Sequence, residues 1–380
     1  MPKRTASQKN TKKVIKNLII IGDSLSDRGV MYGATRIGSK LLSLLGLLNK
    51  SPFNRFTNGY AWTDHLAANL ANKFTVKDLV KKTSHDTKKT NSTDIADGII
   101  THDKKIRKQV DRYTLNDPLQ IRYQNQEFIR SYCEGGLSNH QYPFSFFQLG
   151  YHTATRLVVP YLSNKLSEIK KDDQDRIQQN KQETLTILWS GTNDLGLVND
   201  SNEKEYTGKV HSAIDSLGKS IEELIQSGYC YFLLLNIPDP AQAPGFKETK
   251  PLIEASQYYN KKLWQLRQNL HEQYPHCHFD LFDINLHLQK IVNHPEAYYL
   301  DKSKIKDGYL TSSDFKPIKK SGDLQPASGY LFWDTVHPTT HVHSIIARKV
   351  EKMIRTKYVI EPPTMPTELK EVPRSIKGFF

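Results

Sequence analysis

Three side chains that lie far apart in this sequence are of the types needed for serine-based acyl transfer. Ser24 comes three residues after the apolar run Leu18–Ile21, and Asp334 precedes His337 by three residues. A hydroxyl, an imidazole and a carboxylate in contact supply a nucleophile, a general base and a group that orients the base. We therefore expect Ser24 to attack an acyl carbon, His337 to accept its proton, and Asp334 to hold the imidazole tautomer.

Acyl transfer also needs donors that stabilise the oxyanion of the tetrahedral intermediate. Asn193 follows the apolar stretch Thr184–Trp189, and Gly136 ends the stretch Tyr132–Gly136, where no side chain blocks close approach. With Gly22 allowing a tight turn, the Ser24 backbone N–H is expected near a helix N-terminus, where it could serve as a further donor. The sequence thus predicts an oxyanion hole of Ser24, Gly136 and Asn193.

These residues must be positioned by elements that alternate along the chain. Short apolar runs predict buried strands, and the segments between them carry helical spacing of apolar residues. The expected strands are 17–24, 184–189, 229–235 and 278–282, and the expected helices are 63–71, 210–226, 256–271 and 341–355. Such alternation predicts an α/β fold, a three-layer α/β/α sandwich with a largely parallel, flavodoxin-like central sheet. Ser24 and Asn193 would then share the carboxyl-end rim, where ligands bind in such sheets.

The composition along the chain predicts one catalytic domain between two tails. We expect a basic N-terminal tail over residues 1–16, a domain over 17–358 with a polar surface insertion at about 73–127, and a Pro-rich C-terminal tail over 359–380. The most apolar segment, Leu41–Leu48, fits either a core helix or a lid that rests on lipid. We find no internal repeat.

The charge and the cysteines restrict the classes of partner. The 380 residues carry a formal net charge of +13, which favours anionic partners, including membrane surfaces. No nucleic-acid motif with interleaved aromatic residues is present, so we expect no nucleic acid as partner. The three cysteines are too few and too scattered to predict a disulfide framework or a zinc site.

Nothing in the sequence reads as a secretory leader or a membrane span. The basic N-terminus is followed only by the short apolar run Leu18–Ile21, which leads directly to Ser24. We therefore expect a cytoplasmic enzyme or one exported without a leader. A polar C-terminus with Glu361, Glu368 and Glu371, ending in Phe379–Phe380, resembles in composition the signals on effector proteins that bacteria inject into host cells.

Together the motifs resemble those of the GDSL (SGNH) hydrolase family, in particular its bacterial branch of lipases, phospholipases A and glycerophospholipid acyltransferases. The segments similar to the family's blocks are Gly22–Asp27, Arg55–Trp62, Ser131–Gly136, Gly191–Asp194, Asn236–Pro238 and Asp334–His337. The resemblance implies the SGNH-hydrolase fold and an acyl-enzyme on Ser24 formed from phospholipids or lysophospholipids. It aligns Gly136 with the oxyanion glycine and implies no cofactor and no metal. The departures are the basic insertion, Cys133 within the second block, and the absence of an export leader.

Each motif alone has an ordinary structural interpretation. A Gly-Asp-Ser-Leu tetrapeptide often closes a strand, the Asn193 segment could be an Asx turn, and a single histidine is more often a packing residue than a base. Their joint occurrence on one rim of one sheet favours catalysis.

Two rival functions stay open on the sequence alone. The same triad serves carbohydrate O-acetyl esterases, which a preference for acetyl over longer esters would reveal. A non-catalytic protein that binds anions or lipids would keep its function in a Ser24→Ala variant. Whether water or an alcohol such as a sterol accepts the acyl group depends on how dry the site becomes.

Overall fold

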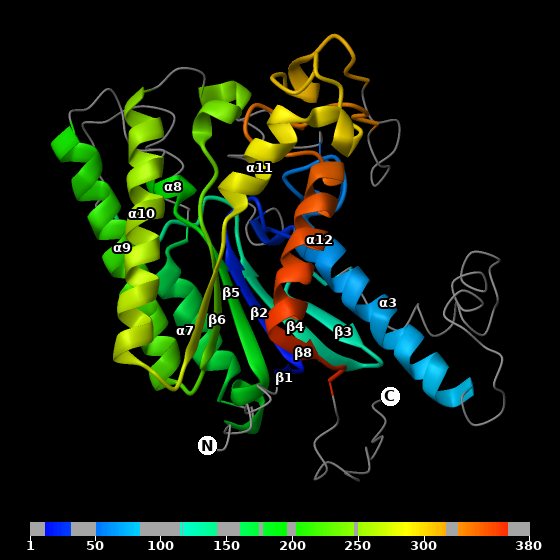
Figure 1. Ribbon diagram of the computed structural model, residues 1–380, viewed down its shortest axis with the longest axis vertical. Coiled ribbons are helices and arrows are strands. Elements are labelled where there is room, and N and C mark those ends of the chain that lie inside the picture. Colours follow the sequence, from blue (N-terminus) through cyan, green and yellow to red (C-terminus); the bar gives the residue numbers. More distant parts are fainter. Residues whose placement is uncertain are drawn as a thin grey trace, which may run out of the picture.

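The computed structural model is a three-layer α/β/α sandwich, as the alternation of apolar segments predicts (Figure 1). It describes residues 12–31, 51–83, 115, 117–142, 160–174, 178–195, 203–246, 250–316 and 326–363. The strands are β1 (Lys13–Ile15), β2 (Asn17–Gly22), β3 (Gln120–Tyr123), β4 (Gln126–Cys133), β5 (Thr184–Trp189), β6 (Tyr231–Leu235), β7 (His278–Phe282) and β8 (Tyr358–Ile360). The α-helices are α3 (Trp62–Thr83), α7 (Leu162–Asp172), α8 (Thr192–Leu195), α9 (Glu203–Gln226), α10 (Lys250–Gln273), α11 (Ile284–Asn293) and α12 (Thr340–Lys357).

The central sheet has six strands in the order β3-β4-β2-β5-β6-β7. Its pairings are parallel except for the antiparallel pair of β3 and β4. The strand that leads to Ser24 therefore lies in the middle, with β4 on one side and β5 on the other. Its Ile19, Ile20 and Ile21 are fully buried, since helices cover both faces of a parallel sheet.

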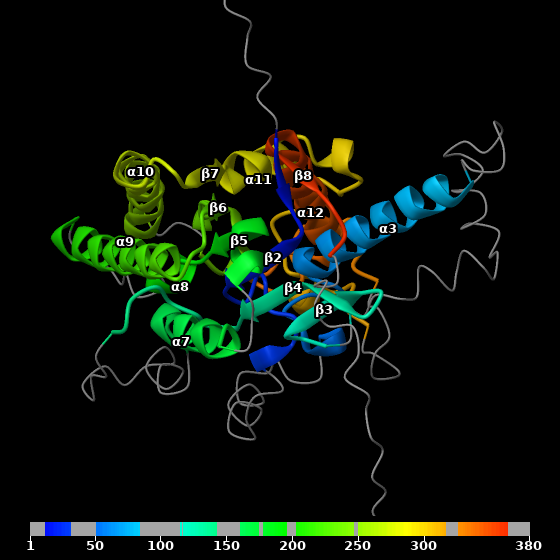
Figure 2. The same cartoon turned by 90° about the horizontal axis from the view of Figure 1, so that it is seen from below.

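Helices pack on both faces of this sheet. Helices α3, α11 and α12 contribute to one apolar cluster, and α7, α9 and α10 contribute to the other. Figure 2 shows the two groups on opposite sides of the strands. No helix among the described residues combines the length and the apolar character that crossing a membrane requires.

The sequence did not predict the pair β3 and β4, although β4 lies beside the central strand. Polar residues interrupt its apolar pattern, above all Arg130, which is buried against Asp173 at 2.9 Å between Nη1 and Oδ1. The ion pair lets a charged residue occupy a buried strand. A pattern read only for apolar residues therefore misses this strand.

The boundaries of the tails and of the insertion also differ from the expectation. Residues 13–15 of the expected basic tail form β1, which pairs in parallel with β8. Regular structure thus extends past both expected limits of the domain, and Ile15, the last residue of β1, is fully buried. Within the insertion, residues 73–83 continue α3 and residues 120–127 form β3 and the start of β4. The leucine-rich segment 41–48 lies outside the described residues.

Candidate active site

Ser24, His337 and Asp334 form a continuous chain of short hydrogen bonds. His337 Nε2 lies 2.8 Å from Ser24 Oγ, and His337 Nδ1 lies 2.7 Å from Asp334 Oδ2. The other carboxylate oxygen, Asp334 Oδ1, accepts hydrogen bonds from the backbone N–H groups of Val336 and His337 at 2.8 and 2.7 Å. The carboxylate is therefore fixed by the same loop that carries the imidazole.

The protonation equilibria of this pair are coupled. Burial alone would lower the pKa of His337, but the Asp334 carboxylate, and more weakly Asp23, raise it above the ordinary value. Burial would likewise raise the pKa of Asp334, yet His337 and the two backbone donors hold it below its usual range. Asp334 thus stays an anion that stabilises a protonated imidazole.

Ser24 lies in a turn rather than at the start of a helix, which corrects one sequence expectation. The Ser26 N–H donates to the Asp23 carbonyl oxygen at 2.9 Å and closes this turn. Further along, the N–H groups of Gly29 and Val30 donate to Asp27 Oδ1 at 2.8 and 2.7 Å. These two N–H groups are already satisfied by the Asp27 carboxylate, so they do not point free toward Ser24.

The two expected oxyanion residues lie on the strands that flank β2. Gly22 pairs with Cys133 of β4 on one side and with Trp189 of β5 on the other, so Gly136 and Asn193 follow strand ends adjacent to Ser24. Gly136 has a φ of +80°, a conformation that favours glycine. The Asn193 side-chain amide donates one hydrogen bond to the Leu137 carbonyl oxygen at 2.9 Å. An amide NH₂ group carries two hydrogens, so the second can serve another acceptor.

A buried carboxylate joins the Ser24 loop to the Gly136 loop. Asp27 Oδ2 accepts a hydrogen bond from the Gly135 N–H at 2.8 Å. A Cβ at Gly135 would lie 2.5 Å from Met31 Sδ and 2.6 Å from Phe56 Cζ. Burial raises the pKa of Asp27 to about 6, against four backbone donors that lower it. The Gly135 N–H is therefore already bonded to Asp27, and a side chain at this position would clash. Gly136 is a glycine for a different reason, its positive φ.

A second buried carboxylate, that of Asp194, lies next to Asn193 in the sequence and supports this segment. Asp194 accepts hydrogen bonds from the N–H groups of Asn139 and His140 at 2.8 and 3.0 Å. Tyr259 of α10 donates to the Ser190 carbonyl oxygen at 3.0 Å. Sequence reasoning missed these supporting residues, because neither Asn139 nor Tyr259 lies within a pattern that points to the rim.

Asp23, the residue before Ser24, has a buried and incompletely hydrogen-bonded carboxyl group. Its Oδ1 accepts a hydrogen bond from the Leu25 N–H at 3.0 Å, while its Oδ2 is buried without a partner among the described residues. Burial raises the pKa of Asp23 to about 7. This carboxyl is therefore partly ionised near neutrality, and it acts electrostatically on His337.

The segment Arg55–Trp62 contacts both the loop after Ser24 and the loop that carries His337. Asp64 at the start of α3 accepts from Arg28 Nε at 2.7 Å and from Arg55 Nε at 2.6 Å, which ties this segment to the loop after Ser24. Two residues after Arg55, Thr57 Oγ1 donates to the Pro338 carbonyl oxygen at 2.8 Å. The Phe56 ring packs on the His337 ring with centroids 5.0 Å apart. The sequence resemblance identified this segment but gave it no role.

One cluster of possible metal ligands lies away from this site. The ligand atoms of Cys230, His276 and Cys277 lie within 4.8 Å of one another where β6 and β7 begin, at the rim opposite to Ser24. Cys230 and Cys277 are far apart in the sequence, and the parallel pairing of β6 and β7, which begin just after them, brings them together. Among the described residues no such cluster includes Ser24, His337 or Asp334.

A parallel α/β sheet with a Ser–His–Asp chain at its carboxyl-end rim is the architecture of a serine hydrolase. The chain belongs to the GDSL-like lipase/acylhydrolase family, whose model matches residues 18–350. It is thus a GDSL-family hydrolase.

Curated relatives align with about half of the chain. A phosphatidylcholine-sterol acyltransferase of Aeromonas hydrophila is 24% identical over 217 residues, 47% of this chain and 63% of that protein. The secreted effector protein SseJ of Salmonella typhimurium is 26% identical over 183 residues, 47% of this chain and 42% of that protein. GDSL esterase/lipase 5 of Arabidopsis thaliana is 23% identical over 200 residues, which are 48% of this chain and 51% of that protein. The chain thus spans less than two thirds of the length of these relatives.

Solved structures of esterases overlap with most of the chain at low identity. An acetylxylan esterase of Geobacillus stearothermophilus, in a catalytic mutant form, is 11% identical over 93% of this chain and 99% of that one, with a TM-score of 0.37. A GDSL-like lipase of Bacteroides thetaiotaomicron is 12% identical over 60% of this chain and 76% of that one, with a TM-score of 0.29.

Proposed function

We propose that this hydrolase cleaves or transfers acyl chains of phospholipids or lysophospholipids through an acyl-enzyme on Ser24. The observation that carries the proposal is the hydrogen-bonded chain from Ser24 Oγ through His337 to Asp334, at 2.8 and 2.7 Å. These distances fall within the range over which a general base can take the nucleophile's proton.

In the first half-reaction, Ser24 Oγ attacks the ester carbonyl carbon while His337 Nε2 takes the hydroxyl proton. The carbonyl electrons move to oxygen, and the resulting oxyanion accepts hydrogen bonds from the N–H groups of Ser24 and Gly136 and from the Asn193 amide. The intermediate then collapses and breaks the bond to the leaving alkoxide, which receives the proton from His337. The ester loses its alcohol, and the acyl group remains on Ser24.

The second half-reaction repeats these steps with a new nucleophile. Water, or an acceptor alcohol, gives its proton to His337 Nε2 and attacks the acyl carbon, and Ser24 leaves with that proton restored. Asp334 stays ionised throughout and stabilises the imidazolium that forms in both halves. Hydrolysis and acyl transfer thus use the same residues and differ only in the acceptor.

Two observations support a phospholipid over other esters. One of the curated relatives is named as a phosphatidylcholine-sterol acyltransferase. The net charge of +13 favours an ester that carries a phosphate. A carbohydrate O-acetyl esterase acts on a substrate without phosphate, so the basic charge would have no role in its substrate binding.

The proposal is tested by lipid profiling of the wild type and Ser24→Ala with phospholipid, lysophospholipid and sterol supplied together. We expect the wild type to release fatty acid or form a sterol ester, and Ser24→Ala to lose at least about a thousandfold in rate. Ser167→Ala, which changes an exposed serine on α7 with only a local bond to Ser163, is the matched control. Full activity of Ser24→Ala would exclude the mechanism, and a strong preference for acetyl esters would identify a carbohydrate esterase instead.

A further inference from the structure

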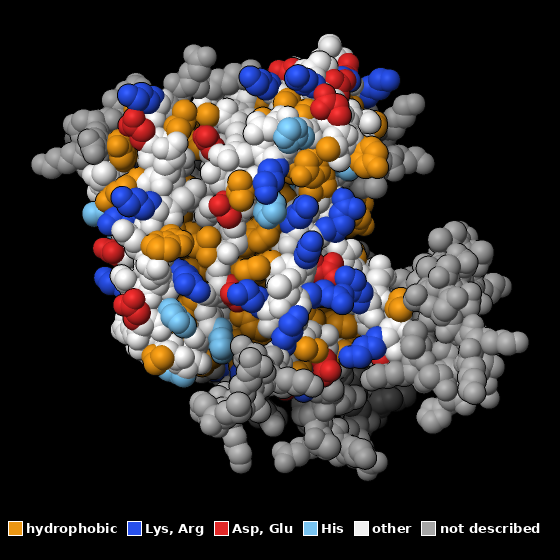
Figure 3. Space-filling view, in the orientation of Figure 1, with side chains coloured by type: hydrophobic (Ala, Val, Ile, Leu, Met, Phe, Trp, Pro, Cys, Tyr) orange, Lys and Arg blue, Asp and Glu red, His pale blue; other side chains and the backbone are white. Residues whose placement is uncertain are grey.

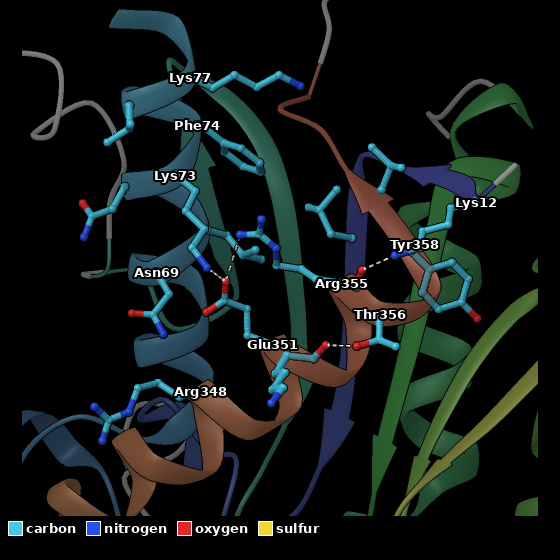
Figure 4. A pocket seen from close by; sticks show the side chains of 16 residues that line it. Lys12, Asn69, Lys73, Phe74, Lys77, Arg348, Glu351, Arg355, Thr356 and Tyr358 are labelled. Carbon is cyan, nitrogen blue, oxygen red and sulfur yellow. Dashed lines mark hydrogen bonds and ion pairs between the residues drawn. The ribbon is translucent and has the colours of Figure 1, made fainter. Parts of the chain in front are cut away.

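A long groove between α3 and α12 lies apart from the Ser24 site. It encloses about 1290 Å³, more than the roughly 300–1,000 Å³ of ordinary small-molecule pockets. Its walls are the two helices, and β8 closes one end (Figure 4). Lys352 follows Thr340, the first residue of α12, by twelve positions, roughly 18 Å along the helix axis. His337 precedes Thr340, so the groove lies toward the opposite end of the helix from the triad.

The rim of this groove is strongly basic. Arg348, Lys352 and Arg355 occur at helical spacing on one face of α12, and Lys73 and Lys77 occur four residues apart on α3. All five side chains are exposed, and Figure 3 shows Lys and Arg side chains gathered along this part of the surface. Like charges at such spacing repel one another in a helix, so an anion bound between the helices would stabilise the arrangement.

Only part of this charge is neutralised within the chain. Glu351 is the one acidic residue among the described residues that line the groove, and both Lys73 and Arg355 form ion pairs with it, as Figure 4 shows. Lys77 lies 3.6 Å from Glu361, and both side chains are well exposed. Arg348 and Lys352 have no side-chain partner among the described residues. These two cations are the strongest candidates for contact with an external anion.

The floor of the groove is apolar rather than polar. It is formed by Leu70, Phe74, Val76, Tyr358, Val359 and Ile360. Leu70, Phe74 and Tyr358 are buried, whereas the side chain of Val359 stays 38% exposed. A polyanion such as a nucleic acid needs no such floor, whereas a ligand with an acyl chain does.

We propose that this groove binds an anionic phospholipid, with its phosphate on Arg348 and Lys352 and an acyl chain on the floor around Val359. Arginine and lysine are the side chains that recognise phosphate, and they do so most strongly where no carboxylate competes. The proposal adds a second lipid site that is separate from the acyl-enzyme site on Ser24. Its occupant would tether the enzyme to membranes rich in anionic lipid.

Vesicle binding tests the charged part of the proposal. The probes are vesicles of phosphatidylcholine alone and vesicles that also contain phosphatidylserine, and the protein is the full chain with Ser24→Ala, which prevents turnover. We expect binding only to the second kind. Because each cation near such a surface contributes roughly fivefold, Arg348→Gln with Lys352→Gln should weaken binding on the order of 25-fold.

The matched control removes the same charge from the opposite face of the sheet. Lys219 on α9 and Lys261 on α10 are both exposed, so Lys219→Gln with Lys261→Gln lowers the net charge equally. Binding of this control should stay within about twofold of the parent protein. An equal loss in the control would show attraction by overall charge alone, and would overturn the groove assignment.

A second measurement distinguishes the lipid from other anions. A soluble short-chain phosphatidylserine should compete with vesicles, and Val359→Ser should weaken that competition, with its fold checked by thermal unfolding. Inorganic phosphate and polyglutamate should compete poorly. Competition by polyglutamate as strong as that by the short-chain lipid would assign the groove to an acidic polypeptide, and competition by phosphate alone would assign it to free phosphate.

The experiment also separates this site from the proposed function. In a background that retains Ser24, the pair Arg348→Gln and Lys352→Gln should hydrolyse a soluble short-chain ester at the wild-type rate. A failure of the acyl-enzyme proposal would leave vesicle binding intact, whereas a failure of the groove proposal would leave ester hydrolysis intact.

Discussion

Asn58 caps the helix that follows His337, although it lies 282 residues away from Thr340 in the sequence. Its Oδ1 accepts a hydrogen bond from the Thr340 N–H at 2.7 Å, where α12 begins. Thr340 Oγ1 in turn donates to the Tyr60 carbonyl oxygen at 2.8 Å. The first N–H groups of a helix have no partner within it, so a side chain from a distant segment here sets where α12 starts. The position of His337 therefore depends on the segment that precedes α3.

We expect Asn58→Ala to impair both stability and catalysis. The loss of a cap should lower the free energy of unfolding by about 0.5–2 kcal/mol. A shift of the loop that carries His337 should also lower kcat by on the order of a hundredfold with little change in KM. Denaturant unfolding and steady-state kinetics on a soluble ester measure the two effects.

Ser344→Ala provides the control for this prediction. Ser344 Oγ donates only to the His341 carbonyl oxygen within α12, at 2.7 Å, so its removal should leave kcat unchanged. If Asn58→Ala lost stability but kept full kcat, the segment would support the fold without positioning His337.

The Asp334 carboxylate provides a second test. Asp334→Asn offers one oxygen where the wild type offers two, so it cannot serve both the backbone N–H groups and His337 Nδ1. The imidazole then loses its anionic partner and its preferred tautomer, and we expect kcat to fall on the order of 10⁴-fold. Steady-state kinetics at neutral pH checks this, and a loss under tenfold would contradict the assigned role.

The oxyanion assignment is tested at Asn193. Removing one oxyanion donor costs roughly 10²–10³ in kcat. We expect Asn193→Ala to show such a loss with KM nearly unchanged, because the donor acts on the transition state. A change confined to KM would instead place Asn193 in substrate binding.

Much of the fold follows from the sequence because its central strands are continuous apolar runs. Predicted strands 184–189 and 278–282 have the bounds of β5 and β7, and 17–24 overlaps β2 closely. The prediction of β4 failed because Arg130 owes its burial to Asp173, a residue forty-three positions away. Likewise β1 has three residues and exists only through its pairing with β8.

The residues of the site likewise fall into those that the sequence predicts and those that only long-range contacts reveal. Ser24, Asp334 and His337 could be selected from the sequence because the chemistry demands those residue types, and the structure brings their side chains together. The roles of Asn58 and Tyr259 could not, since amides and phenols are common and only tertiary packing brings these two to the rim. Local patterns therefore select the side chains that form this hydrogen-bonded chain, while long-range contacts determine how those side chains are held.

Burial of Asp23 predicts an unusual dependence of stability on pH. Its pKa is 3.8 when exposed and about 7 in the fold, so between these values the folded state binds the extra proton. The free energy of unfolding therefore falls as pH rises through this window, on the order of 4 kcal/mol from this group. We expect Asp23→Asn to gain stability relative to the wild type as pH rises from about 4 to 7. Denaturant unfolding at several pH values measures it, and a constant difference would contradict the burial effect.

The same carboxyl should set the acid limit of activity. His337 must be neutral to accept the Ser24 proton, so kcat/KM falls as pH drops through its pKa. Burial lowers that pKa, whereas Asp334 and Asp23 raise it above 6.5 in net effect. Because Asp23 itself titrates near 7, the acid limb reports the Asp23 and His337 pair together.

Asp23→Asn keeps an acceptor for the Leu25 N–H but removes the charge, so the acid limb of kcat/KM should move to lower pH. Asp301→Asn, at an exposed carboxylate, should leave the limb in place. A limb that stays fixed or moves to higher pH in Asp23→Asn would show that Asp23 does not act on the base.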